Sequence, residues 1–120
     1  MITDAEINER LRVLKVADHV QGIGRQGLVD GWRTIIEEIE RGYSGIIEEY
    51  QNDLDMREII EDCGLGNDAE VTALDERFRS QLIKTEQRVW LSKHENAFWI
   101  YGYPKNVSKE NLHEFDRMSY

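Results

Sequence analysis

The sequence predicts an α+β fold, in which a single domain over residues 1–120 is mostly helical and carries a small C-terminal antiparallel β-hairpin. Three observations lead to this prediction. Capping-box patterns precede apolar residues at helical spacing through the first two thirds of the chain. β-Branched and aromatic residues concentrate after Leu82. A length of 120 residues with 40% hydrophobic residues provides for one hydrophobic core.

The first helix is predicted over residues 4–19, because Thr-Asp-Ala-Glu at residues 3–6 forms a capping box and apolar residues follow at helical spacing. Three glycines within residues 22–27 are expected to break it. A second helix then carries an apolar face made of Val29, Trp32, Ile36 and Ile39. Gly42 is placed to end that helix.

Two short helices are predicted between residues 44 and 64. Ser44 is expected to cap the first, and the pattern Asp-Met-Arg-Glu from Asp55 is expected to open the second, which stops at Gly64. A further capping box at residues 67–70 precedes apolar residues at helical spacing, which predicts a helix to about Gln81.

The predicted hairpin comes last. Its strands are residues 89–91 and 97–103, around a turn at residues 93–96. Pro104 cannot donate a ladder hydrogen bond and is expected to end the second strand. Ser108 is placed to cap a final short helix that carries Leu112 and Phe115.

The net charge of −9 is concentrated in the middle of the chain. Between Glu37 and Glu70 there are twelve acids against two bases, a charge of −10, while the rest of the chain carries +1. Such a field repels nucleic acids and anionic membranes and attracts basic surfaces. We therefore expect a basic protein partner, with no direct nucleic-acid or membrane binding.

The expected location is the cytoplasm. A single cysteine, Cys63, fits a reducing compartment, and the first residues lack the pattern of a secretory signal. No apolar run approaches the ~20 residues that span a bilayer.

Motifs for catalysis or metal binding are weak. The pattern G-x-G-x-x-G at residues 22–27 follows a predicted helix and not the strand that a nucleotide site requires. A calcium loop counted from Asp53 has Glu58 and Gly64 where glycine and glutamate are required. No histidine pair has zinc-ligand spacing, and the Glu-x-x-His at residues 110–113 occurs once. We therefore expect no catalytic residue, no cofactor and no metal.

The middle of the chain resembles a known class of proteins. Residues 42–57 contain Tyr, then Asn-Asp-Leu-x-x-Arg, and residues 74–78 read Leu-Asp-x-Arg-Phe, ahead of an aromatic segment. These motifs resemble small acidic bacterial immunity proteins of contact-dependent and polymorphic toxin systems. The resemblance implies a protein that neutralises a toxin nuclease domain, and it marks no inhibitory residue.

The same motifs have a structural reading that is independent of any family. Asp55 would cap a helix, with Asn52 and Asp53 shaping the turn before it. Arg57 would pair with Asp75. The core is expected to include Tyr50, Leu54 and Phe78.

The leading hypothesis is an immunity-type inhibitor, not an enzyme, that binds a basic toxin domain through an acidic surface. The expected partner contacts are Glu37, Glu38, Glu48, Glu49, Asp53, Glu61 and Asp62. Two alternatives remain open: another acidic binding module (a nucleic-acid mimic or a regulatory adaptor), and an enzyme that uses paired carboxylates. The aromatic residues between Trp90 and Tyr103 supply either core or interface. The hypothesis requires that the central acids converge on one surface.

Overall fold

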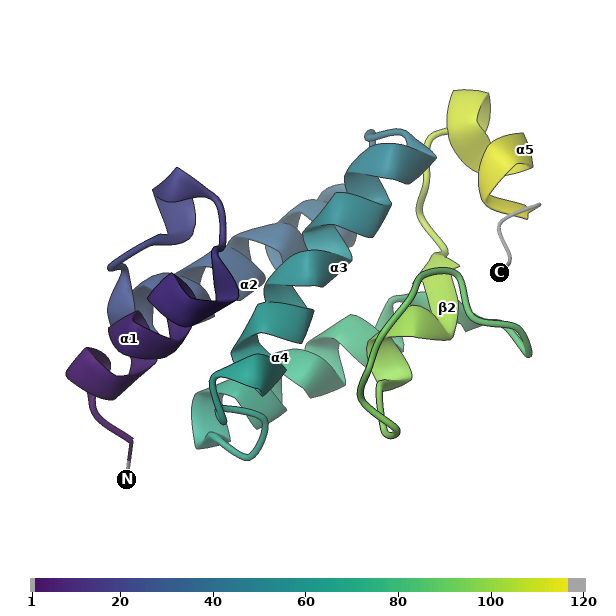
Figure 1. Cartoon of the computed structure of the whole chain (residues 1–120). Helices are drawn as coiled ribbons and strands as arrows, with labels where there is room; N and C mark the ends of the chain where they lie inside the picture. The colour runs from purple at the N-terminus through teal and green to yellow at the C-terminus, as the bar shows by residue number, and fades with distance from the viewer. Residues whose placement is uncertain (1, 117–120) are drawn as a thin grey trace.

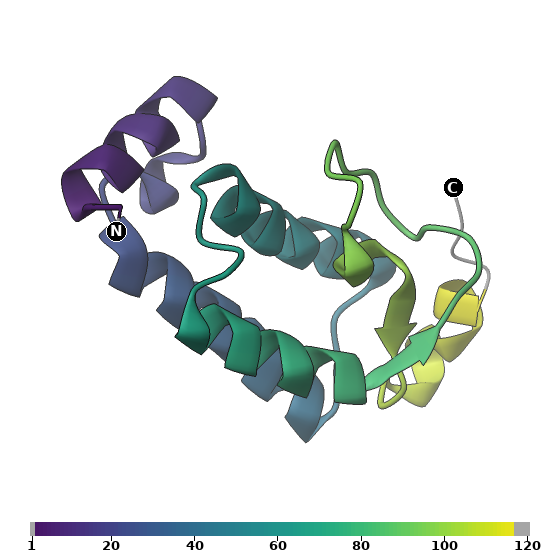
Figure 2. The same ribbon diagram turned by 90° about the horizontal axis from the view of Figure 1, so that it is seen from below.

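The computed structural model describes residues 2–116 as five α-helices, two short 3-10 turns and a two-stranded antiparallel sheet, which confirms the predicted α+β class (Figure 1). The elements are α1 (Asp4–Leu14), η1 (Asp18–Val20), α2 (Gly24–Arg41), α3 (Ile47–Asp62), α4 (Ala69–Ser80), β1 (Leu82–Lys84), η2 (Phe98–Ile100), β2 (Gly102–Pro104) and α5 (Lys109–Asp116). Helix α2 packs against α1, α3 and α4. The strands and α5 lie at the end of the molecule opposite α1 (Figures 1 and 2).

Helix α1 begins as predicted and ends earlier. The Thr3 hydroxyl accepts the Glu6 N–H at 3.2 Å, and the helix stops at Leu14 because Lys15 turns into the left-handed region with φ of 56°. The prediction of helix to residue 19 was therefore wrong in its last turn, where η1 forms instead.

The predicted break at residues 22–27 is shorter than expected, because α2 already starts at Gly24. Two side chains of α1 cap this start. Asn8 accepts the Gly24 N–H and Asp4 accepts the Arg25 N–H, each at 2.9 Å. At the other end Gly42 follows the helix with φ of 111°, as predicted for a terminating glycine.

Helix α3 is continuous, so the two short helices predicted between residues 44 and 64 were wrong. Asp55 lies in the helix interior, exposed, and accepts the Trp90 indole N–H at 2.9 Å instead of capping a helix. No glycine or proline interrupts residues 47–62, and one face continues through both halves, because Tyr50, Leu54 and Arg57 are all buried. That shared face keeps the two halves in one helix.

Helix α4 matches its prediction to within a residue. The Asp68 carboxylate accepts the N–H groups of Glu70 and Val71, so the cap lies one residue later than the start of the predicted box. Phe78 packs on Trp32 of α2, with ring centroids 4.9 Å apart.

The core contains the predicted ion pair. Arg57 donates to both carboxylate oxygens of Asp75 at 2.9 Å, and both side chains are buried. Tyr50, Leu54 and Phe78 are also buried, as predicted.

The two-stranded sheet forms, but its first strand was misplaced. Leu82–Lys84 pairs with Gly102–Pro104, with Ile83 opposite Tyr103, while residues 89–91 form no strand. Within the predicted second strand, residues 98–100 turn into η2, which buries Trp99 and Ile100 in the core. Pro104 ends β2 as predicted, and α5 follows Ser108 with Phe115 buried.

Within residues 2–116, no helix combines the length and apolar character needed to cross a membrane.

Candidate functional site

The acidic residues of the central segment divide into groups with different surroundings. Several of them form ion pairs with arginines of the protein itself. Arg25, Arg33 and Arg77 lie outside the central segment, and Arg57 is a buried residue within it. These pairs are Glu40 with Arg77, Asp68 with Arg25, Glu70 with Arg25 and Arg33, and Glu61 with Arg57. The protein thus compensates part of the central negative charge internally. The expectation that the central acids converge on one surface was therefore wrong for these residues, and the inhibitor hypothesis depends on a smaller group.

A second group lies between α2 and the first half of α3. Glu38 of α2 acts electrostatically on Asp53 of α3, as does Glu49, one turn before Asp53 on the same helix. The Tyr43 hydroxyl donates to Asp53 Oδ2 at 2.7 Å. Among the described residues, no ion pair involves any of these three carboxylates, although Arg41 follows Glu38 by one turn. We call Glu38, Glu49 and Asp53 the acidic cluster.

The acidic cluster has an electrostatic signature. Burial raises the pKa of Asp53 above its ordinary value, and the charges of Glu38 and Glu49 raise it further. The hydrogen bond from Tyr43 partly offsets this rise in the Asp53 pKa. Burial and the same hydrogen bond raise the pKa of the Tyr43 hydroxyl, so it remains the donor. Ionisation of Asp53 therefore costs more free energy here than in water, and a nearby cation would reduce that cost.

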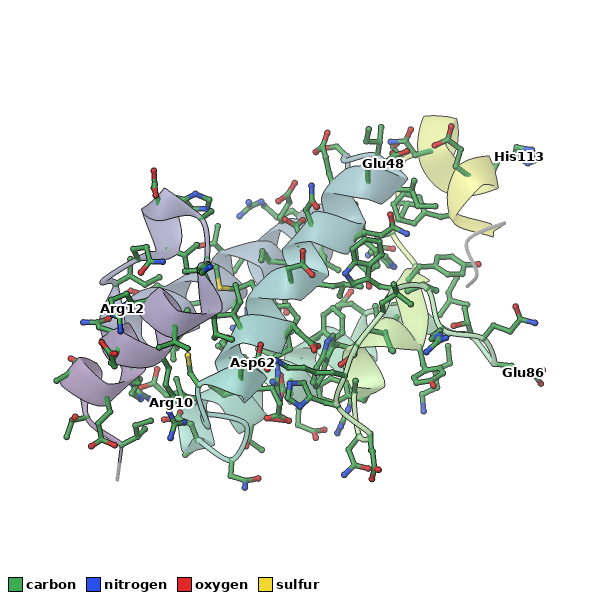
Figure 3. The ribbon with its side chains drawn as sticks, viewed as in Figure 1. Arg10, Arg12, Glu48, Asp62, Glu86 and His113 are labelled. Carbon is green, nitrogen blue, oxygen red and sulfur yellow. The ribbon has the colours of Figure 1, made fainter. Side chains whose placement is uncertain are left out.

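The remaining predicted contact residues lie elsewhere. Glu37 acts electrostatically on Arg77, which places it toward α4. Glu48 is exposed in the first turn of α3, and Asp62 lies at the opposite end of that helix (Figure 3). Glu61 is beside Arg57, and Asp62 contacts Lys93 and His94. Of the seven predicted residues, the structure brings together Glu38, Glu49 and Asp53.

A groove of about 560 Å³ lies next to the acidic cluster. The segment after α1, one side of α3 and Ile35 of α2 line it. Its apolar lining includes Val20, Ile35, Met56 and Ile59, and its carboxylates are Asp53, Asp55 and Glu58. Because Asp53 belongs to both, the groove and the acidic cluster are continuous.

A third group was missed from the sequence. Glu58 and Asp62 on α3 meet His94 from the connection between β1 and η2. The histidine is remote in the chain, and it was assigned to a hairpin turn that does not form. The four-residue spacing of the two acids was a usable signal, because both fall within the helix predicted from Asp55 to Gly64, but no local pattern indicated that His94 would join them.

The glycine motif at residues 22–27 overlaps the first turn of α2, where Asn8 accepts the Gly24 N–H and Asp4 accepts the Arg25 N–H. The protein's own side chains therefore occupy the positions that a phosphate would need.

A comparison with protein-family models, with curated proteins and with solved structures finds no match to this chain, so its function is inferred from its own residues.

Proposed function

We propose that this protein is an immunity-type inhibitor that captures a basic protein, a toxin nuclease domain, on the surface between α2 and α3. The observation that carries the proposal is the acidic cluster of Glu38, Glu49 and Asp53, which no arginine, lysine or histidine of the described chain neutralises. The nuclease identity of the partner rests on the resemblance of residues 42–57 and 74–78 to such inhibitors.

The cost of the acidic cluster supports a binding role. Like charges one helical turn apart destabilise a helix, and burial disfavours an ionised carboxylate. The same chain places arginines against Glu40, Asp68 and Glu70, whereas Asp53 lies half-buried beside two like charges with no such partner in the part of the chain that the structure describes. A cation from a partner would remove the repulsion within the cluster.

The adjoining groove supplies the other element of a protein interface. Interfaces depend on a few apolar or aromatic anchors in pockets, surrounded by polar contacts. An apolar side chain of the partner fits between Ile35, Met56 and Ile59, while flanking lysines or arginines reach Asp53 and Asp55. This combination favours a basic segment that also carries an exposed apolar residue.

A nuclease substrate channel has the required chemistry. It carries positive charge because it binds phosphates, and a carboxylate surface competes for the same side chains. Inhibition of this kind needs no catalysis by the inhibitor. A nucleic-acid mimic needs acids spaced along an extended surface, whereas the acidic cluster of Glu38, Glu49 and Asp53 is a compact group.

The proposal predicts that a toxin nuclease domain is encoded beside this gene, and the test measures inhibition of that domain in a nuclease assay and its binding by calorimetric titration. The double variant Glu38→Gln/Glu49→Gln should bind at least about 30-fold more weakly and lose inhibition, since a broken charge contact costs about 2–5 kcal/mol. The control Glu9→Gln/Glu76→Gln removes the same charge from exposed pairs with Arg12 and Arg79. It should bind within about 3-fold of the unmodified chain.

If both double variants lost the same affinity, net charge and not the acidic cluster would explain binding. If the neighbouring toxin domain did not bind the unmodified chain, the immunity function would be rejected. Affinity for the toxin should also fall as the salt concentration rises.

A further inference from the structure

The second half of α3 carries a group of metal-ligating side chains apart from the acidic cluster. Glu58 and Asp62 are one helical turn apart, and His94 reaches them from the irregular connection between β1 and η2. The exposed fractions of the side chains are 17% for Glu58, 10% for Asp62 and 27% for His94. These three are therefore partly enclosed and do not belong to a freely solvated acidic face.

The donor atoms are already at the separations that one metal ion requires. One ligand atom from each residue lies within 4.8 Å of the other two. His94 Nε2 is 2.8 Å from Asp62 Oδ1 and 3.6 Å from Glu58 Oε1. Tetrahedral ligands with bonds of 2.0–2.1 Å are about 3.3 Å apart, between these two distances.

Neighbouring groups orient the donors. Ser92 Oγ donates to Glu58 Oε2 at 2.7 Å, and the Lys93 N–H donates to Glu58 Oε1 at 3.3 Å. The His94 N–H donates to Ser92 Oγ at 3.0 Å, which fixes the backbone that carries the imidazole. Hydrogen bonds that orient the metal-coordinating side chains raise the affinity for the metal.

We propose that Glu58, Asp62 and His94 form a binding site for a divalent first-row transition-metal ion, with Zn²⁺ as its best-matched occupant. An imidazole nitrogen with two carboxylates suits zinc, whereas Mg²⁺ and Ca²⁺ favour oxygen ligands throughout. The ion takes the place of the hydrogen bond between His94 and Asp62, and the two carboxylates balance its charge. Three protein ligands leave a coordination position for water.

One group of the protein competes with the ion. Lys93 Nζ is 3.0 Å from Asp62 Oδ1, but its side chain is 63% exposed and can turn away into solvent. The ion ties residues 92–94 to α3, so metal binding should stabilise the packing of this connection.

The test is calorimetric titration of the metal-free, untagged chain with ZnCl₂. The expected result is one ion per chain and a melting temperature that rises with Zn²⁺. His94→Gln and Asp62→Asn should each lower the affinity at least ~10-fold, since loss of a supporting partner alone costs 10–100-fold. Lys93→Ala should raise the affinity, because it removes the competing cation.

Two matched controls separate this site from other ligands. His113→Gln removes an exposed histidine of α5, and Glu48→Gln removes an exposed carboxylate of α3, and both should bind Zn²⁺ as the unmodified chain does. His94 lies on a loop, so the fold of His94→Gln is verified by its melting curve without metal. The site is rejected if the unmodified chain binds no Zn²⁺ at micromolar concentration. It is also rejected if a folded His94→Gln retains full affinity.

Discussion

The guanidinium of Arg57 and the carboxylate of Asp75 are joined by two parallel hydrogen bonds of 2.9 Å inside the hydrophobic core. The same Asp75 oxygen that accepts Arg57 Nε also accepts the Trp32 indole N–H at 3.0 Å. Arg57 in turn lies over the Trp99 ring, 4.5 Å from its centroid. One ion pair therefore connects α2, α3, α4 and η2, and its loss leaves polar groups in the core without partners.

Asp75→Ala should destabilise the fold by about 3–5 kcal/mol, because it leaves the Arg57 charge buried and uncompensated. Urea unfolding monitored by circular dichroism measures the loss. The control Glu76→Ala changes an exposed neighbour on α4 whose pair with Arg79 is at the surface, and it should cost less than about 1 kcal/mol. Similar losses for the two variants would contradict a special role for the buried pair.

Asp53→Asn should stabilise the free protein at neutral pH by about 0.5 kcal/mol, the scale of one like-charge pair. Asparagine keeps an acceptor for Tyr43 and removes the repulsion from Glu38 and Glu49. Because the folded-state pKa of Asp53 is raised, the folded protein holds that proton more tightly, and stability falls as pH rises through its titration.

The gain in stability from Asp53→Asn should therefore vanish at pH values below the ordinary pKa of an aspartate, where residue 53 is neutral in both the unmodified chain and the variant. Melting temperatures from pH 2.5 to 8 test this sign. Asp55→Asn, on the exposed side of the same helix, serves as the reference. Under the proposed function, Asp53→Asn also weakens partner binding while it stabilises the free chain, and a variant that loses both stability and binding would argue for a structural role.

Asp68→Ala should cost about 1–2 kcal/mol, because Asp68 caps α4 through two N–H groups and pairs with Arg25. Asp68→Asn keeps the capping acceptor and loses the charge, so its loss relative to the unmodified chain isolates the ion pair, and the difference between the two variants isolates the cap. Hydrogen bonds from Arg25 lower the pKa of Asp68. Its contribution is thus present above the ordinary carboxyl pKa and lost as pH falls through the lowered value, which acid unfolding of the variants measures.

Gly102→Ala should destabilise the sheet by about 1–3 kcal/mol. A Cβ at this position would be 2.9 Å from the Ile83 carbonyl oxygen and 3.1 Å from the Leu82 side chain, so the strands must separate. Lys84 lies opposite Gly102 in the register and is exposed, so Lys84→Ala should leave stability nearly unchanged. Thermal unfolding of the two variants decides whether close approach at Gly102 matters.

Local sequence patterns predicted most helix positions because caps and apolar spacing act over a few residues. Thr3 and the periodic residues of α4 are examples. The same local pattern failed at Asp55, where a capping-box sequence lies inside α3. There the buried face of Tyr50, Leu54 and Arg57 continues through the pattern, so tertiary packing overrides the local signal. Likewise Leu82 follows the helical spacing of α4 but begins β1, because pairing with residues 102–104 decides its conformation.

The candidate sites depended still more on tertiary contacts. Counting charges within residues 37–70 located the acids but not the cations that reach them from Arg25, Arg33 and Arg77. That Glu38 meets Asp53 follows from the antiparallel packing of α2 on α3. That His94 meets Asp62 follows from the path of an irregular loop. Neither contact can be predicted from the spacing of these residues in the sequence.

The short sheet has a consequence for biogenesis. β1 emerges from the ribosome directly after α4, but its partner β2 comes only after residues 85–101, and Phe115 comes later still. Until then, the aromatic faces of Tyr43 and Tyr50 that Phe115 covers remain open to other nascent chains. Two strands of this length do not hold together alone, so closure must wait for the docked helices. Slow translation through residues 85–115 should therefore prolong exposure to aggregation and to chaperones.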